Sequence, residues 1–378
     1  MKMQQKVILS LGSNQGNRLE HIENCIQQIH QKIGLILHIS NLYETPSWGF
    51  SSDSFYNCAL VLHTSFTAEK ILQKIASIEK ELGRIKQNTN DYQARIIDID
   101  IIAIDEQIYS SETLNIPHKE MQNRLFVLLP MLDLKLEWQH PILKKPVQKL
   151  IAICNDKSDC KWVCNLDSVL RKYSISQFNY IVIEGNIGAG KTTLTSKIAE
   201  DFFAKSVLER FADNPFLLKF YKDQNRYAFP LEMQFLADRY QQLFDDLSQL
   251  DLSKDLVIAD YHIYKSLIFA KVTLQEDEFK LYKNLFDIII KEMPKPDLYV
   301  YLYQNTDQLL QHIKNRGRSY EQEIEAEYLE KINHSYLDYI KSQTDLNILI
   351  IDVSGSNFVE KQEDYVTILD AIQEKLEI

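Results

Sequence analysis

The sequence predicts two domains of different class, an α+β sandwich followed by a doubly wound α/β domain with a parallel sheet. Its 378 residues exceed the usual single-domain length of about 100–200 residues. In the second half, short apolar runs alternate with amphipathic segments of helix length, which is the pattern of parallel βαβ units. In the first half, alternating strand patterns and two helical patterns indicate helices packed on a mostly antiparallel sheet.

The first domain is expected over residues 1–165. Apolar and polar residues alternate there in segments that indicate half-buried strands, at 7–13, near 42–64 and at 97–104. Apolar residues recur at helical spacing over about 18–33 and 67–83. The polar, aperiodic stretch that follows predicts a linker over residues 166–178.

The second domain is expected over residues 179–378. Its β-rich apolar runs lie at 180–184, 206–209, 255–260, 297–303 and 347–353. Amphipathic segments between them, such as 227–248 and 325–341, predict the helices that cover both faces of the sheet.

Composition limits the compartment and the partners. No apolar run approaches the roughly 20 residues that a membrane span needs, and the five cysteines form no CxxC pair, so we expect free thiols and a cytoplasmic protein. The net charge is −11, whereas residues 1–165 carry 18 basic and 18 acidic residues, so the acidic excess lies in the second half. An acidic surface argues against binding a nucleic-acid polymer, and no membrane partner is expected.

A glycine-rich loop opens the second domain. GNIGAGKT matches the GxxxxGK[ST] pattern, in which glycines let backbone N–H groups surround phosphates at a helix N-terminus. Lys191 is expected to reach the β- and γ-phosphates, and the Thr192 hydroxyl to ligate Mg²⁺. The expected ATP-binding residues are Gly185, Asn186, Ile187, Gly188, Ala189, Gly190, Lys191, Thr192 and Thr193.

A pair of aspartates marks the last strand pattern of the first domain. Asp98 and Asp100 are two residues apart on a predicted strand, so both carboxylates point to one face. Two convergent carboxylates suit Mg²⁺ bound together with substrate phosphates. The alternative is a charged face on an ordinary edge strand, and the pattern alone leaves both open.

Three segments of the second half resemble the deoxyribonucleoside kinases, particularly the bacterial enzymes that act on deoxyadenosine and deoxyguanosine. They are LERFADNPFL (208–217), FYKDQNRYAFPLEMQFLADRYQQ (220–242) and RGRSYEQ (316–322). The resemblance implies a P-loop kinase fold in which Glu209 is the general base for the nucleoside 5′-hydroxyl. It also implies the following roles: Tyr221 and Glu321 on the sugar 3′-hydroxyl, Arg316 and Arg318 on the transferred phosphoryl group, Asp260 on Mg²⁺, and Asn357 and Phe358 over the ATP adenine.

Two departures from that family bear on mechanism. Asp260-Tyr261 stands where relatives have an acidic residue and an arginine. The missing positive charge is expected from Lys265 or from the RGRSYEQ segment, which resembles the lid of the family. Glu232 stands where relatives commonly use Gln to bind the base. A carboxylate only accepts hydrogen bonds, which suits the two donors of guanine or the single amino group of adenine. Arg239 either adds a donor toward N7 or forms an ion pair with Glu232. Both readings favour a purine over thymine, and the overall resemblance favours deoxyadenosine.

Six segments of the first half resemble 6-hydroxymethyl-7,8-dihydropterin pyrophosphokinases of the folate pathway. They are LGSNQGN (11–17), YETPSWG (43–49), FYNCALVL (55–62), EKELGR (79–84), ARIIDIDI (94–101) and IPHKEMQNRLF (116–126). The resemblance implies a ferredoxin-like sandwich that transfers the pyrophosphoryl group of ATP to the pterin hydroxymethyl oxygen and releases AMP.

The same resemblance implies site residues in the first domain. Asp98 and Asp100 would bind two Mg²⁺ ions. Arg84, Arg95, His118 and Arg124 would contact the triphosphate, with Glu79 on the ATP side. Substrate contacts are expected from Thr45, Pro46, Asn57 on the pterin amide edge, and Phe55 and Phe126 on the two ring faces. The departures are Phe55 in place of a tyrosine, Gln93-Ala94 in place of Gly-Pro, and Tyr92 in place of a tryptophan.

The sequence thus predicts a bifunctional transferase that uses ATP and Mg²⁺, with a dihydropterin and a purine deoxynucleoside as small-molecule substrates. A homodimer through the kinase domain is expected from the second resemblance. Two alternatives remain: the first domain is an inactive pterin-sensing or scaffolding module beside a kinase that prefers deoxyguanosine, or the second domain is a nucleoside monophosphate kinase.

Overall fold

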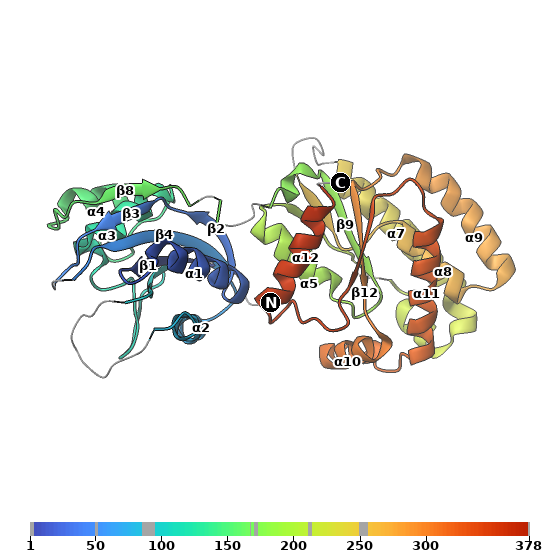
Figure 1. The fold of residues 1–378 in the computed structure, drawn as a ribbon. Coiled ribbons are helices and arrows are strands. Elements are labelled where there is room, and N and C mark those ends of the chain that lie inside the picture. The colour runs from blue at the N-terminus through green and yellow to red at the C-terminus, as the bar shows by residue number, and fades with distance from the viewer. Residues whose placement is uncertain are drawn as a thin grey trace. The chain divides into compact units, whose positions relative to one another are not determined.

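The chain folds into two compact units whose main parts are residues 1–172 and 173–360 (Figure 1). The structure, a computed structural model, describes residues 4–49, 52–84, 95–166, 168–169, 173–210, 214–248 and 256–376. The predicted departures at Tyr92, Gln93 and Ala94 lie outside these described residues. The division between the units falls inside the predicted linker.

The first unit is built on a six-stranded antiparallel sheet with the order β5-β1-β4-β3-β8, in which β2 also pairs with β4. Its strands are β1 (Gln5–Ser13), β2 (Leu35–Ile39), β3 (Leu42–Thr45), β4 (Phe55–Thr64), β5 (Asp98–Ile104) and β8 (Lys161–Cys164). A separate small ladder joins β6 (Tyr109–Ser110) and β7 (Asn115–Ile116). The antiparallel sheet agrees with the sequence prediction, whereas β8 lies in a stretch where no period was recognised.

Helices cover both faces of this sheet. They are α1 (Arg18–Lys32), α2 (Ala68–Glu81), α3 (Leu125–Asp133) and α4 (Val147–Ile153). Successive residues of a strand point to opposite faces, and so Leu9 and Leu11 pack with α1 and α2 while Ile8 packs with α3 and α4. The sheet is therefore the middle of three layers, with one hydrophobic core on each side.

The second unit is built on a five-stranded parallel sheet with the order β10-β11-β9-β12-β13. The strands are β9 (Tyr180–Gly185), β10 (Lys205–Val207), β11 (Val257–Ala259), β12 (Leu298–Tyr303) and β13 (Ile348–Asp352). Each of them falls on a run that was predicted as a strand, so the parallel α/β class is confirmed. The strand order reverses direction at β9, and ligands of such folds bind beyond the carboxyl ends of the strands at that point.

Helices also lie on both faces of the parallel sheet. Those after residue 173 are α5 (Lys191–Asp201), α6 (Leu217–Lys222), α7 (Gln224–Ser248), α8 (Tyr264–Thr273), α9 (Glu276–Ile289), α10 (Thr306–Arg316), α11 (Ala326–Ser342) and α12 (Gln362–Glu374). Figure 1 shows α5 and α12 on one side of β9 and β12, and α8 and α11 on the other. Tyr180 and Val182 of β9 belong to the core beneath α7, α8 and α11.

The residues of the predicted linker do not all lie between the units. Tyr173 donates its hydroxyl to Asp370 of α12 at 2.9 Å, and the Ser174 N–H donates to Gln373 at 2.7 Å. Ile175 and Phe178 are buried. The end of that stretch therefore packs as part of the second unit.

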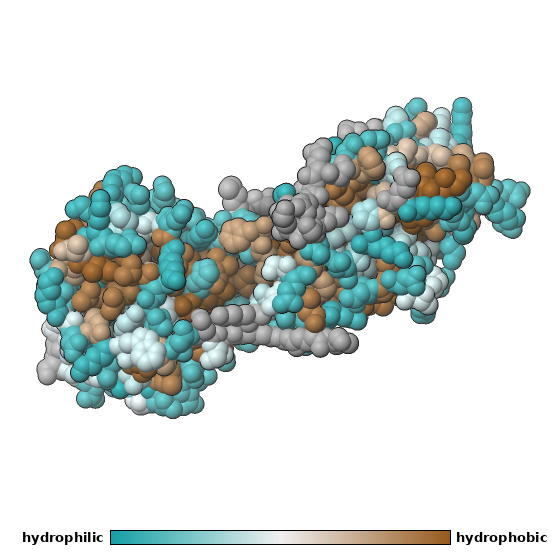
Figure 2. Space-filling model, turned by 90° about the horizontal axis from the view of Figure 1, so that it is seen from above, coloured by the Kyte–Doolittle hydropathy of each residue, from teal (hydrophilic) through white to brown (hydrophobic). Residues whose placement is uncertain are grey.

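The surface mixes apolar and polar groups. In the face drawn in Figure 2, hydrophobic and hydrophilic residues alternate over each unit. Large exposed hydrophobic side chains occur in both units, for example Trp162 in the first and Ile288 in the second. Within the described part of the chain, no helix combines the length and the hydrophobicity needed to cross a bilayer.

Candidate active sites

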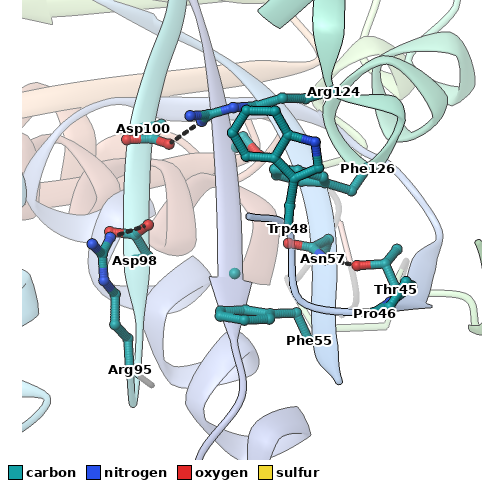
Figure 3. Close-up of a pocket in the computed structure, with 12 residues that line it drawn as sticks. Thr45, Pro46, Trp48, Phe55, Asn57, Arg95, Asp98, Asp100, Arg124 and Phe126 are labelled. Atoms are coloured by element: carbon teal, nitrogen blue, oxygen red, sulfur yellow. Dashed lines mark hydrogen bonds and ion pairs between the residues drawn. The ribbon is translucent and has the colours of Figure 1, made fainter. Parts of the chain in front are cut away.

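The first unit contains a pocket at the edge where β5, β1 and β4 lie side by side (Figure 3). Its walls border about 590 Å³ of space, part of which is open to solvent. Its lining residues are Ser10, Gly12, Thr45, Pro46, Trp48, Phe55, Asn57, Arg95, Asp98, Asp100, Arg124 and Phe126. The structure therefore brings together residues that the sequence placed far apart along the chain.

The acidic side of this pocket comes from β5. Asp98 pairs in register with Gly12 of β1, and Asp100 pairs with Ser10. Because side chains alternate along a strand, both carboxylates lie toward the pocket while Ile99 is buried on the other face. The predicted common face of the two aspartates is thus observed, and it lines a cavity although β5 is an edge strand of the sheet.

Three arginines surround these carboxylates. Asp98 forms ion pairs with Arg84 at 2.8 Å and with Arg95 at 2.6 Å. Arg124 lies 3.8 Å from Asp100, and Figure 3 shows it reaching the pocket from above that residue. Such guanidinium groups are suited to phosphate oxygens, so positive and negative charges alternate around the position of a bound triphosphate.

The environment of Asp100 favours a bound cation. Desolvation within the pocket and the neighbouring Asp98 carboxylate raise the pKa of Asp100 to about 7, although its side chain keeps 37% of its exposure. No cluster of three or more His, Cys, Asp or Glu side chains among the described residues forms a metal site. Mg²⁺ is commonly held by one or two carboxylates with substrate phosphates supplying further oxygens, so the pair of aspartates fits it.

The other side of the pocket suits a flat polar ring. Asn57 is buried and donates a hydrogen bond from Nδ2 to Thr45 Oγ1 at 2.7 Å. A Cβ atom on Gly12 would lie 3.0 Å from Asn57 Oδ1 and 3.6 Å from the Phe55 ring. Glycine at this position in β1 therefore leaves open the space beside Asn57.

Aromatic rings flank that space. In Figure 3 the Phe55 ring lies below Asn57, and the rings of Phe126 and Trp48 lie above it. The Trp48 and Phe126 centroids are 6.5 Å apart, and the Arg124 guanidinium lies 4.8 Å above Trp48. Sequence reasoning did not assign Trp48, although it belongs to the YETPSWG segment that carried the resemblance.

Three residues expected at this site lie behind the pocket lining. Glu79 is buried, accepts a hydrogen bond from the Ile99 N–H at 3.0 Å and pairs with Arg84, so it anchors β5 rather than facing a ligand. Arg84 contacts the site through Asp98. Burial lowers the pKa of His118, whose Nδ1 accepts the Glu120 N–H at 3.2 Å. These residues are not among those that line the pocket, and their contact with ATP stays a prediction.

The second unit contains a longer cavity beyond the carboxyl ends of β9, β10 and β11, of about 840 Å³. It is lined by Ile187, Gly188, Lys191, Thr192, Glu209, Leu217, Phe220, Tyr221, Leu231, Glu232, Phe235, Arg239, Asp260, Lys265, Phe269, Arg316, Arg318, Tyr320, Glu321 and Tyr328. Sequence reasoning missed its aromatic residues at 220, 235, 269, 320 and 328, since most of them read as the apolar face of an ordinary helix.

The glycine-rich loop forms one end of this cavity. Gly190 has a φ of +89° and directly precedes α5, and an added Cβ would lie 2.7 Å from the Phe358 ring. Phe358 is thus packed on the loop, whereas Asn357 is exposed and bonds Glu360. Lys191 Nζ donates to the Asn186 carbonyl at 2.8 Å, and burial and Lys265 lower the pKa of Lys191 to about 8.

Asn186 has a structural role in the loop. Its Nδ2 donates to the Leu329 carbonyl and to Asn333 Oδ1 of α11, both at 2.8 Å, and its Oδ1 accepts the Ile187 N–H. The side chain is fully buried. Asn186 therefore fastens the loop to α11, and only its backbone remains available to phosphates.

The two predicted metal-binding groups of this unit are in contact. Thr192 Oγ1 donates to Asp260 Oδ2 at 2.5 Å, and Asp260 Oδ1 accepts the Glu209 N–H at 2.7 Å. A hydroxyl and a carboxylate at the mouth of a phosphate loop provide the oxygen ligands that Mg²⁺ prefers. Their arrangement fits a metal bound together with ATP phosphates.

Glu209 lies shortly after β10, and two cationic side chains contact its carboxylate. Arg239 donates to Oε1 from Nε and NH2, each at 2.8 Å, and Lys265 Nζ lies 2.5 Å from Oε2. Burial by itself raises the pKa of Glu209, but Lys265 and Arg239 outweigh it and lower the pKa to about 2. Tyr261, at the position of the missing arginine, is buried in the core, so Lys265 supplies positive charge there.

Arg239 does not form the ion pair with Glu232 that the sequence left open. Its NH1 donates instead to Ser266 Oγ at 2.8 Å, while Nε and NH2 contact Glu209. Glu232 is buried and its Oε1 accepts the Thr273 hydroxyl at 3.0 Å. Arg239 is therefore a partner of Glu209 rather than of Glu232.

Residues of the RGRSYEQ segment line the same cavity. Glu321 pairs with Arg316 and, at 3.1 Å, with Arg318. The ring of Tyr221 lies 6.1 Å from that of Tyr320. The residues expected to bind the sugar 3′-hydroxyl and the phosphoryl group are thus gathered at one wall.

Comparisons with known proteins match each unit separately. The pattern of the deoxynucleoside kinase family matches residues 181–377, and that of the 7,8-dihydro-6-hydroxymethylpterin-pyrophosphokinase family matches residues 8–136. Deoxyguanosine kinase of Bacillus subtilis is 38% identical over 52% of this chain and 96% of that protein. Deoxyadenosine kinase of Lactobacillus acidophilus is 30% identical over 52% of this chain and 95% of that protein.

The first unit has its own relatives. The 2-amino-4-hydroxy-6-hydroxymethyldihydropteridine pyrophosphokinase of Aquifex aeolicus is 34% identical over 38% of this chain and 88% of that protein. Both resemblances read from the sequence are confirmed, and the two matched stretches do not overlap. The chain is a fusion that belongs to the hydroxymethyldihydropterin pyrophosphokinase family through its first unit and to the deoxynucleoside kinase family through its second.

Proposed function

We propose that the chain catalyses two ATP-dependent transfers. The first moves a pyrophosphoryl group to 6-hydroxymethyl-7,8-dihydropterin and releases AMP. The second phosphorylates the 5′-hydroxyl of a purine 2′-deoxynucleoside and releases ADP. The observation that carries the proposal is that each unit has its own cavity, lined by carboxylates and cations from the segments that define its family.

In the first reaction the pocket holds the two substrates end to end. Asp98 and Asp100 are the candidate ligands of Mg²⁺, which would neutralise charge on the triphosphate. Arg95 and Arg124 bind phosphate oxygens and orient the pyrophosphoryl group toward the ring side. Asn57 and the rings beside it hold the pterin, so that its hydroxymethyl oxygen is aligned with the β-phosphorus.

In the second reaction Glu209 accepts a hydrogen bond from the 5′-hydroxyl and takes its proton as the bond to phosphorus forms. The cations beside it keep the carboxylate ionised, as a base must be. Phosphoryl transfer proceeds through a loose transition state that demands positioning more than a strong base, so a low pKa is compatible with this role. Lys191, Arg316 and Arg318 neutralise the charge of the phosphates.

The acceptor of the second reaction is a nucleoside in this proposal. Tyr221 offers a hydroxyl donor and Glu321 a carboxylate acceptor to a free sugar hydroxyl. The relatives named above act on deoxyguanosine or on deoxyadenosine, and these names support a purine. Overall sequence resemblance predicted deoxyadenosine.

One assay tests both halves. Purified protein is incubated with ATP and Mg²⁺ and either the pterin, a deoxynucleoside or a deoxynucleoside monophosphate, and the adenine nucleotides are separated by chromatography. The proposal requires AMP with the pterin and ADP with a deoxynucleoside. ADP without AMP would support the alternative of an inactive first unit, and ADP only with monophosphates would make the second unit a monophosphate kinase.

A further inference from the structure

One buried carboxylate oxygen in the cavity of the second unit has no hydrogen-bond partner. Glu232 lies on α7 with a residue exposure of 2%, and its Oε2 is unsatisfied among the described residues. A buried polar atom without a partner is costly, the more so when charged. Such an atom in the lining of a substrate cavity indicates that a ligand supplies the missing donor.

The neighbours of Glu232 hold it in place and leave this oxygen open. Thr273 of α8 donates its hydroxyl to Oε1, which fixes the plane of the carboxylate. Arg239, on the same face of α7, donates hydrogen bonds to Glu209 and Ser266. Arg239 makes its hydrogen bonds with these two groups and none with Glu232, so Oε2 is open to a donor from a ligand.

The position of Glu232 along the cavity indicates which part of the substrate it meets. Thr192 of the phosphate loop contacts Asp260, Asp260 accepts the Glu209 N–H, and Glu209 contacts Arg239 of α7. Glu232 precedes Arg239 by seven residues on the same face of α7, and the cavity lining also includes Phe235 and Phe269, whose rings suit a flat heterocycle. With the 5′-hydroxyl at Glu209, Glu232 therefore faces the base.

We propose that Glu232 binds the Watson–Crick edge of the base and selects guanine over adenine, which rests on the proposed deoxynucleoside kinase function. Guanine presents adjacent donors, N1–H and the 2-amino group, to the two oxygens of a carboxylate. Adenine presents one amino donor and the acceptor N1, whose lone pair would face a carboxylate oxygen. This selection reverses the deoxyadenosine preference that overall resemblance predicted.

The first test uses the unaltered protein and a panel of nucleosides. Deoxyguanosine has both donors, deoxyinosine keeps N1–H but lacks the 2-amino group, and deoxyadenosine has the opposite pattern at N1. We expect kcat/KM for ADP formation to fall in that order, by about tenfold for deoxyinosine and about 100-fold for deoxyadenosine, the range of a lost bidentate contact. Equal or higher kcat/KM for deoxyadenosine would overturn the inference.

The second test exchanges the acceptor for an amide. In Glu232→Gln the side chain accepts from the adenine amino group and donates to N1, so the ratio of kcat/KM for deoxyguanosine over deoxyadenosine should fall about 100-fold. Glu330→Gln, an exposed carboxylate on α11, is the matched control and should leave the ratio unchanged.

The outcomes separate this inference from the proposed function. A protein that forms no ADP with any deoxynucleoside would refute the kinase proposal itself. A protein that phosphorylates deoxynucleosides but whose Glu232→Gln variant keeps the original ratio would refute only the role of Glu232. The panel on the unaltered protein decides the preference even where the variant does not fold.

Discussion

At the scale of single residues, the general base of the kinase unit is held by two cations from different helices. Lys265 comes from α8 and Arg239 from α7, and both contact the carboxylate of Glu209. Tyr261, at the position where the family resemblance implies an arginine, is buried in the core. The positive charge beside Glu209 comes from Arg239 and Lys265.

The role of Lys265 can be tested by Lys265→Met. We expect kcat for deoxynucleoside phosphorylation to fall about 100-fold, because removing one group that stabilises transition-state charge costs on the order of 10²–10³ in rate. AMP formation with the pterin should not change, because the pterin site belongs to the other unit, and circular dichroism of the variant should show that the kinase unit is still folded. Lys271→Met on the same helix, whose side chain is 52% exposed, is the control. An unchanged kcat in Lys265→Met would contradict the assignment.

The preference between purines should depend on pH through Glu232. Burial raises the pKa of Glu232 to about 7, although Arg239 opposes this. The facing titratable groups are Arg239 and Glu209, Lys265 of α8, Tyr282 of α9, Tyr221 of α6 and Tyr328 of α11. Above the pKa the carboxylate is ionised and accepts from guanine, whereas below it the protonated group donates and accepts like glutamine.

We therefore expect the ratio of kcat/KM for deoxyguanosine over deoxyadenosine to fall roughly tenfold from about pH 8 to about pH 6, as the ionised fraction of Glu232 decreases. Steady-state rates at a series of pH values measure it. The Glu232→Gln variant has no such proton and should show a flat ratio. A flat ratio in the unaltered protein would argue against titration of Glu232.

At the scale of elements, each site is set by the repeat of one helix or one strand. Glu232, Phe235 and Arg239 lie on one face of α7 because residues three, four and seven apart in a helix share a face. On β5 the strand repeat places Asp98 and Asp100 together, opposite Gly12 and Ser10 of β1. The regular backbone of α7 and β5 therefore fixes the spacing of the side chains that line the two sites.

Asp98→Asn with Asp100→Asn tests the β5 face. The change keeps the size of the side chains and removes the anionic oxygens that suit Mg²⁺, so pterin-dependent AMP formation should fall at least about 100-fold, since a catalytic metal contributes several kcal/mol. Chromatography of the adenine nucleotides measures it. ADP formation with deoxynucleosides should persist. Unaltered AMP formation would remove both aspartates from the mechanism.

Gly12→Val tests the ring side of the pocket. A Cβ at this position would lie 3.0 Å from Asn57 Oδ1, whose amide is held by Thr45 and has little freedom to move. Valine is at ease in a strand, so the fold should persist while KM for the pterin rises about tenfold or more. Initial rates at varied pterin concentration measure it, and an unchanged KM would place the ring elsewhere.

At the scale of the whole molecule, the two candidate sites belong to different units, each with its own core. The first unit has hydrophobic cores on both faces of the antiparallel sheet, and the second has a separate core beneath α7, α8 and α11. The proposed reactions share ATP but have no intermediate in common. The fusion therefore requires no transfer of a product from one site to the other.

The two activities should be separable and additive. Lys191→Met should abolish ADP formation and leave AMP formation intact, and the aspartate variant should do the reverse, because the substituted groups belong to different units and share no hydrogen-bond or ion-pair partner. With saturating ATP, the rates measured with both acceptors present should equal those measured singly. A pterin rate that changes when a deoxynucleoside is added would reveal coupling between the units.

The sequence by itself determined the two families, the parallel sheet of the second unit and most of the charged groups of both sites. Motifs such as GNIGAGKT and ARIIDIDI are recognised because their functional residues lie close together in the sequence at fixed spacing. Helices and strands are predicted from the period of their apolar residues, which follows from backbone geometry. Strand β8 escaped prediction because a short strand at the edge of a sheet has too few residues to show a period.

Only the tertiary structure decided which partner each charged group has. Helical spacing allowed Arg239 to pair with Glu232, but Glu209 and Ser266 approach it from other elements and take its donors. Glu79, which the sequence placed on the ATP side of the site, is buried and binds the Ile99 N–H and Arg84. Such pairings depend on burial and on contacts between residues far apart in the sequence, which the spacing of residues along the chain does not reveal. They leave Oε2 of Glu232 without a hydrogen-bond partner, and the proposed choice of base depends on this oxygen.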